Sequence, residues 1–553
     1  MFFVRKTYRS VCLFQISLLL LVAWTLPLWA GTPKVRILVE GAEIRGTQGI
    51  EFDHQGRLLV ASVLERAILV VDPQSGRVLE RLDSAQGVET PDDVAVGPDG
   101  SIYWTAIWTG DIGRLDPDGT SRTLTNLGVG VNPLGFSPDG RLFVGAAVFG
   151  NGLFEVDPEG IEPPRTILTS LGGGPNSFDF GPEDGLLYAP LSFTGEVVRV
   201  DVDTAVVEEV TSGLQIAPSV IFDPDGRLLA SDGGAGVILE VDPETGTTIV
   251  DSEPGPGSDT LAFDDHGRGF ISNSYDGSIK RQRPNGTWRE ISRGGLTASG
   301  GVAVLPGRRP GRNRVFVGDL FSLSEFNGRN GRRRNYVPFS VFPGELNAFS
   351  TVSADGDHLI LSSFFFNTVE VWDPDTEEVL QRVADFGVPT NAIRFDGDLV
   401  VAELATGQVV RADGTDPSQR TVVASGLAIP SGLAADGDDL YISDWALGTL
   451  WQAVDNGAVL DPPRVVATGL SQPEGMVMDA YGKLLVVESG AQRLLEIDPI
   501  SGAIEVVVGG LGVGADPLPN LPPIWIFSGI DVGANGAIYV GGDRENVIYR
   551  IRR

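Results

Sequence analysis

Cysteine is almost absent from this chain of 553 residues, and its one cysteine, Cys12, lies in an apolar N-terminal segment. Beyond that segment the chain has no thiol for a disulfide or a Cys-ligated metal site, so stability must come from packing. Histidine is scarce as well, with only His54, His266 and His358. Each stands in an expected turn between two strands, away from the polar positions described below, which argues against a Ser-His-Asp hydrolase.

Positive charge is also in short supply. The chain holds 41 Lys and Arg against 73 Asp and Glu, a formal net charge of −32. Three basic residues and no acidic residue lie in the first 30 positions, so the remainder is more acidic still. This balance excludes nucleic acid as a partner, because a phosphate backbone requires a basic surface. It favours attraction of cations.

Long apolar runs are limited to one, residues 11–30, which follows Arg5, Lys6 and Arg9 and ends in the small pair Ala30-Gly31. This pattern is typical of an export signal, so we assign residues 1–30 as a signal peptide. The chain is then exported, to the periplasm or the extracellular space, with no membrane span after signal removal. The alternative is an uncleaved membrane anchor, since the run is nearly long enough to cross a bilayer.

Glycine and proline, in contrast, are abundant, with 72 and 36 residues. Frequent turns exclude an all-helical bundle. One unit recurs, in which an apolar strand, a polar Gly-containing turn and a second apolar strand follow one another, as in GIEFDHQGRLLVAS, DVAVGPDGSIYWTA, PLGFSPDGRLFVGA and EGMVMDAYGKLLVVE. The first core residue of each unit is Ile50, Val94, Leu134, Phe178, Val220, Leu261, Val302, Val352, Ile393, Leu433, Met476 and Ile530.

These units recur at intervals of 40 to 54 residues, the spacing of four-stranded propeller blades. Twelve blades exceed one ring, so we expect an all-β fold of two tandem six-bladed β-propellers after the signal segment. The predicted domains are residues 31–298 and 299–553, divided at the Gly/Ser-rich stretch 292–301. A spare strand, KVRILVEG, precedes the first unit. It completes either the last blade or the first propeller, and the sequence leaves both open.

Residues two positions before each core residue should form a ring at one channel mouth. The first half supplies Gln48, Asp92, Asn132, Asn176, Pro218 and Asp259, and the second supplies Gly300, Ser350, Asn391, Ser431, Glu474 and Ser528. Converging Asp, Asn and Gln oxygens are the ligands that Ca²⁺ or a similar divalent cation prefers. The first ring is therefore the better candidate metal site. The alternative is that these side chains hydrogen-bond to backbone groups where the strands begin.

A second acidic set ends the second strands: Asp232, Asp319, Glu403, Asp444, Glu488 and Asp543. Such residues anchor the turn into the third strand, although one or two could face the channel as a general base. Aromatic residues in the expected blade-top loops are Trp104, Trp108, Phe364, Phe365, Phe366 and Trp445. They pack between blades or against the other propeller, or they line a substrate pocket.

Arginines gather in the seventh unit of this acidic chain, at Arg308, Arg309, Arg312, Arg314, Arg329, Arg332, Arg333 and Arg334. Guanidinium groups at this density suit an anionic ligand or partner. Pairing with the acidic surface of the other propeller is the alternative.

The stretches PSGLAADGDDLYISDWALGTLW and PEGMVMDAYGKLLVVESGAQRLLEID resemble NHL-type repeats. The first half is also similar to the senescence marker protein/gluconolactonase family. That resemblance implies a divalent metal in the channel and hydrolysis of lactones or related esters. The matching ligand positions are Gln48 in TQGIEF, Asn176 in PNSFDF and Asp259 in SDTLAF, with Asn132 in VNPLGF nearby. Gln48 stands where that family has Glu, and Asp259 falls in the sixth unit where the fifth is expected.

The sequence as a whole favours an exported tandem propeller whose first channel binds a divalent cation and hydrolyses a small lactone or ester. Gln48, Asn132, Asn176 and Asp259 are the expected metal ligands, and Asp92 or Asp232 is the expected catalytic base. The alternative is a non-catalytic NHL-like scaffold that binds a protein or an envelope component. Both roles occur on propellers, so the fold does not choose between them.

Overall fold

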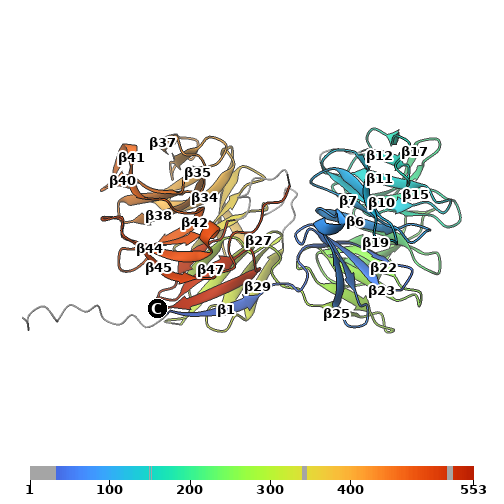
Figure 1. The fold of residues 1–553 in the computed structure, drawn as a ribbon, viewed down its shortest axis with the longest axis horizontal. Coiled ribbons are helices and arrows are strands. Elements are labelled where there is room, and N and C mark those ends of the chain that lie inside the picture. Colours follow the sequence, from blue (N-terminus) through green and yellow to red (C-terminus); the bar gives the residue numbers. More distant parts are fainter. Residues whose placement is uncertain (1–32, 149, 151, 310, 339–345, 520–526) are drawn as a thin grey trace, which may run out of the picture.

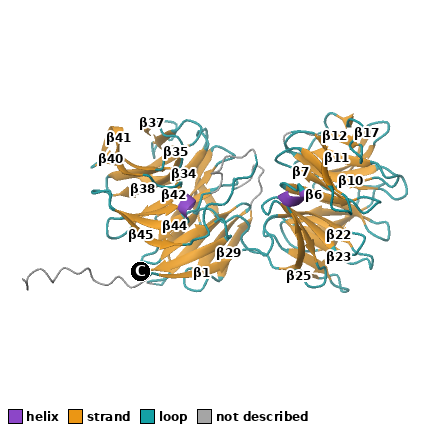
Figure 2. Ribbon diagram, in the orientation of Figure 1, coloured by secondary structure: helices purple, strands orange, loops and turns teal. Residues whose placement is uncertain are grey.

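The chain forms almost nothing but antiparallel β-sheet in a computed structural model that describes residues 33–553 except 149, 151, 310, 339–345 and 520–526 (Figures 1 and 2). Its strands make twelve four-stranded sheets. Two short 3-10 helices, η1 (Ser84–Gln86) and η2 (Ser489–Ala491), complete the assigned elements of this part. The signal peptide predicted at residues 1–30 lies outside the described residues. Among those that are described, no helix combines the length and apolar character needed to cross a membrane.

Six sheets, each formed by four consecutive strands, make the first ring. They are β2–β5 (Thr47–Phe52, Leu58–Ser62, Ala67–Val71, Val78–Leu82), β6–β9 (Pro91–Val96, Ile102–Ala106, Asp111–Leu115, Ser121–Asn126), β10–β13 (Val131–Phe136, Leu142–Ala146, Leu153–Val156, Arg165–Leu168), β14–β17 (Asp179–Phe180, Leu187–Leu191, Glu196–Asp201, Val206–Ser212), β18–β21 (Ser219–Phe222, Leu228–Asp232, Val237–Val241, Thr248–Ser252) and β22–β25 (Ser258–Phe263, Gly269–Asn273, Ile279–Gln282, Trp288–Ser292).

The second ring has five sheets of the same kind and a sixth of mixed origin. They are β26–β29 (Val302–Pro306, Asn313–Asp319, Ser322–Asn327, Arg333–Pro338), β30–β33 (Thr351–Asp355, His358–Ser363, Thr368–Asp373, Glu378–Val383), β34–β37 (Pro389–Phe395, Asp398–Glu403, Gln408–Ala412, Arg420–Ala424), β38–β41 (Pro430–Asp436, Asp439–Asp444, Thr449–Asp455, Ala458–Thr468), β42–β45 (Pro473–Met478, Leu484–Glu488, Arg493–Ile497, Ile504–Gly509) and β46–β48 (Ile530–Val532, Ile538–Gly542, Val547–Arg552) with β1 (Lys34–Glu40).

Each repeat predicted from the sequence corresponds to one sheet of the structure. Eleven of the twelve predicted core residues lie in the first strand of a sheet, and the twelfth, Phe178, directly precedes β14. The turns follow the same logic, as at Gly140, whose N–H donates to the Ser137 carbonyl at 2.9 Å with a φ of 84°. That left-handed conformation suits glycine. Each sheet buries its faces against its neighbours, so that Val70 of β4 and Trp104 of β7 share one core.

Both rings are closed. In the first ring β2 packs against β22, and in the second β26 packs against β46, so the first and last sheets of each ring are neighbours. The prediction of two six-bladed propellers is therefore confirmed.

The two rings close differently because β1 pairs with β48 and so belongs to the last sheet of the second ring. In Figure 1 this blue strand lies among the red strands of that ring. The predicted domain 31–298 placed these residues in the first propeller, and this assignment of β1 is corrected. After β1 the chain builds the entire first ring and returns through residues 293–301. The outgoing and returning segments are hydrogen-bonded, Ala42 N to Leu296 O at 2.8 Å and Glu43 N to Arg293 O at 3.0 Å.

The rings meet through turns that join second and third strands and, in the second ring, also through Leu518, which lies after the fourth strand β45. Val63 and Ile107 of the first ring share an apolar cluster with Leu518 of the second. Tyr275 stacks on Phe321 with ring centroids 5.8 Å apart. Because antiparallel strands alternate in direction, these turns lie at the same end of each ring as the start of the first strands. The two channel mouths predicted from the sequence therefore lie on the faces through which the rings meet.

Candidate functional site

The residues predicted to line the first channel mouth come from separate blades of one ring. Gln48 lies in β2, Asp92 in β6, Asn132 in β10 and Asp259 in β22, near the start of each strand, and Asn176 precedes β14. First strands line the channel of a propeller, so these positions share one end of it. Asp92 and Asp259 are the two carboxylates of the set.

Asp92 and Asp259 form a buried acidic pair. Their side chains belong to residues that are 7% and 6% exposed. Burial, then the charge of Asp259, then that of Asp93, raise the pKa of Asp92 well above its usual range. Burial raises the pKa of Asp259 to about 7, and a hydrogen bond from Ser274 opposes this rise. Among the described residues no Lys, Arg or His forms an ion pair with either carboxylate. The pair thus lacks a compensating charge from the protein.

Asp93 is a buried acid at the same mouth that the sequence interpretation did not single out. Its Oδ1 accepts from Val94 N at 2.9 Å and its Oδ2 from Leu134 N at 3.2 Å, which links the second blade to the third. Burial nevertheless raises its pKa to about 7. The adjacent pair Asp92-Asp93 was the available signal, but consecutive strand residues point to opposite faces, so only one was expected at the channel.

The neutral residues of the predicted metal set differ in whether their side-chain oxygens already accept a hydrogen bond. Asn176 Oδ1 accepts from Ser177 N at 2.9 Å, and its Nδ2 donates to Ser192 Oγ at 3.3 Å. Both polar atoms of this amide are hydrogen-bonded within its own blade, and its role as a cation ligand stays a prediction. Gln48 and Asn132 are half-buried. Two carboxylates, with amide and water oxygens around them, are a donor set that suits Ca²⁺.

No group of three or more His, Cys, Asp or Glu side chains with the makings of a metal site occurs in the described part of the chain. A cation at this mouth would therefore be held by Asp259 together with neutral oxygens, with Asp92 beside it. The chemistry of these two acids fits a divalent cation, because a bound positive charge opposes the burial and the repulsion that raise the pKa of Asp92.

Asp232, the other predicted base, acts as a turn anchor. Its carboxylate accepts from Gln215 N at 2.9 Å, Ile216 N at 3.3 Å and Ala235 N at 3.0 Å. Asp444 does the same in the second ring, with Ala428 N at 2.8 Å and Leu447 N at 3.0 Å. These bonds hold the turn between the second and third strands, so the repeated acid at this position has a structural reason in both rings.

The second ring has a cavity of about 220 Å³ in its channel, lined by the first strands of its blades. Its lining includes two charged residues, Arg394 of β34 and Asp531 of β46, and Asn391 lies near one end. Arg394 is neutralised by Asp355 at 2.9 Å, and Asn391 Oδ1 is buried without a hydrogen-bond partner. Glu474 accepts from Ser528 N at 2.7 Å, and burial followed by the charge of Asp543 raises its pKa. The second ring thus has a buried acidic pair as well, Glu474 and Asp543, but backbone N–H groups donate hydrogen bonds to both carboxylates.

Of the predicted loop residues, several aromatic side chains pack in apolar clusters, and one arginine of the predicted cluster forms ion pairs. Trp108 and Phe364 pack in the apolar cluster between the rings, and Trp104 packs between blades. Arg314 is paired with Glu325 at 3.0 Å and Asp375 at 2.9 Å within the second ring. A further cavity of about 360 Å³ between the rings is lined by mutually paired charges, including Arg45 with Glu65 at 2.9 Å.

Comparison with known proteins gives likeness in fold only. No protein-family model matches the chain, and no curated protein matches it in sequence. A streptogramin B lyase structure is 16% identical over 52% of this chain and 95% of its own, with a TM-score of 0.38. The gluconolactonase XC5397 from Xanthomonas campestris is 18% identical over 44% of this chain and 86% of its own, with a TM-score of 0.36. The extracellular domain of the putative one component system BT4673 from B. thetaiotaomicron is 12% identical over 92% of this chain and 76% of its own, with a TM-score of 0.33.

Proposed function

We propose that the protein is an exported tandem propeller that binds a divalent cation at the mouth of its first channel and hydrolyses a small lactone or ester there. The observation that carries the proposal is the buried pair Asp92 and Asp259, two acids from blades two and six with no cationic side chain beside them. Buried charges require a partner or a proton, and a divalent cation supplies the partner.

In this proposal Asp259 holds the cation, with Gln48 and Asn132 as neutral oxygen donors. When bound, such a cation polarises the carbonyl of an ester and lowers the pKa of water. Asp92 takes the proton from the attacking water, because burial and the charge of Asp259 raise its pKa and so make it a stronger base than an ordinary carboxylate. Asp93 holds β6 to β10 and so keeps Asp92 in place. Asp232 and Asn176 have positional roles, since their polar atoms are hydrogen-bonded to other parts of the first ring.

The test begins with calorimetric titration of the chelator-treated protein with Ca²⁺, Mg²⁺, Mn²⁺ and Zn²⁺, followed by pH-stat assays on simple lactones and esters. We expect one cation to bind and to support hydrolysis. Asp259→Asn should weaken cation binding by at least about tenfold, because a charged ligand is lost. Asp92→Asn should lower kcat by about a hundredfold or more and leave the fold intact.

Asp232→Asn is the control for this test, because its carboxylate is engaged by backbone N–H groups and should lie outside the cation site. This variant should bind the cation as the unaltered protein does. Absence of any cation-dependent heat or change in Tm would reject the site. Cation binding without hydrolysis of any compound tested would reject the hydrolase and favour a non-catalytic binding protein.

A further inference from the structure

A concentration of positive charge lies where the two ends of the described chain meet the seventh blade. In the register of β1 with β48, Lys34 stands opposite Arg552 and Arg36 opposite Arg550. Like charges in direct cross-strand positions destabilise a strand pair. Arg36 and Arg550 both donate to the carbonyl oxygen of Arg329, which lies in the turn between β28 and β29. The same turn packs against β1, because Gly331 faces the Leu38 carbonyl.

We call this surface the basic edge and define it as Lys34, Arg36, Arg329, Arg332, Arg333 and Arg552. All six residues are exposed. In the described part of the chain, none of them lies within ion-pair distance of an acidic side chain. Two other residues of the predicted arginine cluster, Arg314 and Arg334, do contact an acid, Glu325, at 3.0 and 3.8 Å.

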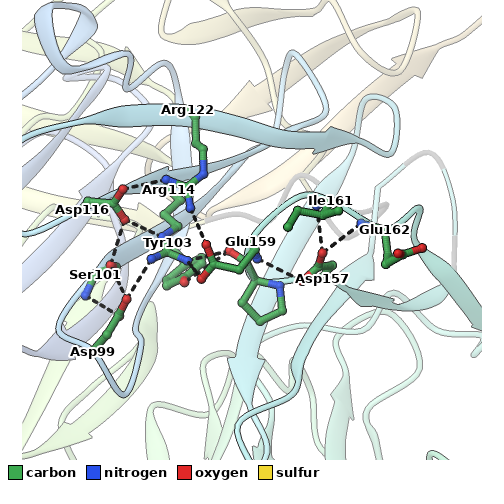
Figure 3. Close-up of polar contacts among 11 residues, drawn as sticks. Asp99, Ser101, Tyr103, Arg114, Asp116, Arg122, Asp157, Glu159, Ile161 and Glu162 are labelled. Carbon is green, nitrogen blue, oxygen red and sulfur yellow. Dashed lines mark hydrogen bonds and ion pairs between the residues drawn. The ribbon is translucent and has the colours of Figure 1, made fainter.

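Most arginines elsewhere in the described part of this acidic chain form ion pairs with carboxylates. Figure 3 shows Arg114 of β8, whose side chain is 7% exposed, bonded to Asp116 and Glu159 at 2.6 Å and to Asp99 at 2.8 Å. The chain has 73 acidic residues for 41 basic ones, so acids are not scarce. The basic edge therefore gathers six basic side chains without an ion pair on one surface of a chain in which most described arginines are paired.

Arg550 beneath the edge adds an independent sign of a missing anion. The residue is only 6% exposed, and its Nε is buried without a hydrogen-bond partner. Its nearest aromatic neighbour is Tyr539, with the guanidinium carbon 6.0 Å from the ring centroid. Burial, and then the charges of Arg552 and Arg36, lower its pKa. A buried guanidinium without a carboxylate is costly, and an anion at the surface above it would reduce that cost.

The position of the edge indicates which anion is available. The turn that carries Arg329 joins a third strand to a fourth, so it lies at the end of the ring opposite the face that meets the first ring. The sequence immediately before Lys34 contains the apolar run 11–30. On the alternative that this run is an uncleaved membrane anchor, it would bring β1 to the membrane surface. The chain is acidic overall, so anionic lipid would repel most of its surface and attract this edge.

We propose that the basic edge docks on an anionic phospholipid surface and holds the second ring at the membrane with the first ring directed away from it. The lipid phosphates supply the counter-charges that the edge lacks within the protein. The contact is electrostatic and so weakens with salt. This role is separate from cation binding at the first channel, because the residues lie in different rings.

The test is co-sedimentation of the full chain with vesicles of phosphatidylglycerol and phosphatidylcholine, compared with vesicles of phosphatidylcholine alone. Because the apolar N-terminal segment could insert into either vesicle, the readout is the ratio between the two. Replacing Arg332→Ser and Arg333→Ser should lower that ratio by about 25-fold, at roughly fivefold for each basic residue near a charged surface. High salt should have the same effect on the unaltered protein.

The matched control is Arg283→Ser with Arg289→Ser, which removes two exposed arginines from the sixth blade. This control should keep the full preference for anionic vesicles. A second variant, Lys34→Ser with Arg552→Ser, should raise Tm by relieving a like-charge pair and yet weaken vesicle binding, which separates docking from folding. Equal binding of the unaltered protein to both vesicles overturns the proposal. An unchanged ratio in the Arg332/Arg333 variant also overturns it. So does a protein that binds soluble inorganic phosphate or another protein but shows no preference for anionic vesicles.

Discussion

The two rings of this protein are built from the same repeat but are closed by different means. In the first ring all six sheets come from consecutive strands, and closure depends on side-chain packing between β2 and β22 and on a bond from Thr47 Oγ1 to Asn273 O at 2.9 Å. In the second ring β1 adds a backbone ladder to β48, and Asp531 of β46 accepts from Val304 N of β26 at 2.7 Å. The ring that holds both chain ends thus has the more extensive closure.

The channels differ in how their buried acids are held. In the first, burial and the charge of Asp259 raise the pKa of Asp92, whereas in the second Glu474 and Asp543 accept hydrogen bonds from Ser528 N and Gly514 N, both at 2.7 Å. Carboxylates that repel one another weaken the fold unless a cation or protons compensate them. The acidic pair of the first ring lies in the ring with the simpler closure, and a cation that compensates this pair would stabilise that ring.

The largest expected effect concerns Asp259 and pH. Its raised pKa means that the folded state binds more protons than the unfolded state between pH 4 and 7, so this group makes stability fall as pH rises through that window. In the chelator-treated protein, Asp259→Asn should increase the free energy of unfolding at pH 8 by up to about 4 kcal/mol and leave it nearly unchanged at pH 4. Denaturant titrations at both pH values measure this.

Asp118→Asn, at an exposed turn of the first ring, is the control for that experiment and should change stability at neither pH. An Asp259→Asn protein whose stability has the same pH dependence as the unaltered protein would show that the acidic pair does not strain the first ring.

The next effect concerns β1. A Cβ on Gly331, which has a φ of 72°, would lie 1.9 Å from the Leu38 carbonyl oxygen, so Gly331→Ala should displace β1 and cost about 3 kcal/mol. Gly286 occupies the equivalent turn of the sixth blade, with a φ of 80° and open space around it. Gly286→Ala should cost only about 1 kcal/mol of conformational strain. Equal losses for the two variants in denaturant titrations would contradict a closing role for β1.

The smallest expected effect compares one hydrogen bond between the first and last sheets of the first ring with one between two consecutive sheets of the second ring. Thr47→Val removes the bond to Asn273 O across the first ring's closure, and Thr351→Val removes the matching bond to Thr390 O at 3.0 Å inside the second ring. Each should cost about 1 kcal/mol. Only Thr47→Val should speed amide hydrogen exchange along β2 and β22, because only this seam lacks a continuous chain across it. Faster exchange at both seams would remove the distinction between them.

Much of the fold could be predicted from the sequence because each blade is specified locally. A core residue such as Ile50 or Leu433 occupies the same position before the Gly-containing turn of its unit. A strand hairpin needs little more than alternating apolar residues and such a turn. The positions of Asp92 and Asp259 at one mouth followed directly from the same alignment. The engagement of Asn176 by Ser177 and Ser192 did not follow, because the direction of a short amide depends on neighbours from another strand.

The number of blades, their core residues and the position of each acid within its first strand follow from the sequence, since a blade depends on contacts within about forty residues. The tertiary structure alone decided that β1 joins β48 and that the channel faces meet. It also decided that Lys34, Arg329 and Arg552 share one surface. These arrangements bring together residues separated by hundreds of positions, and the choice of partner for an unpaired strand edge depends on which edge the closed ring leaves open.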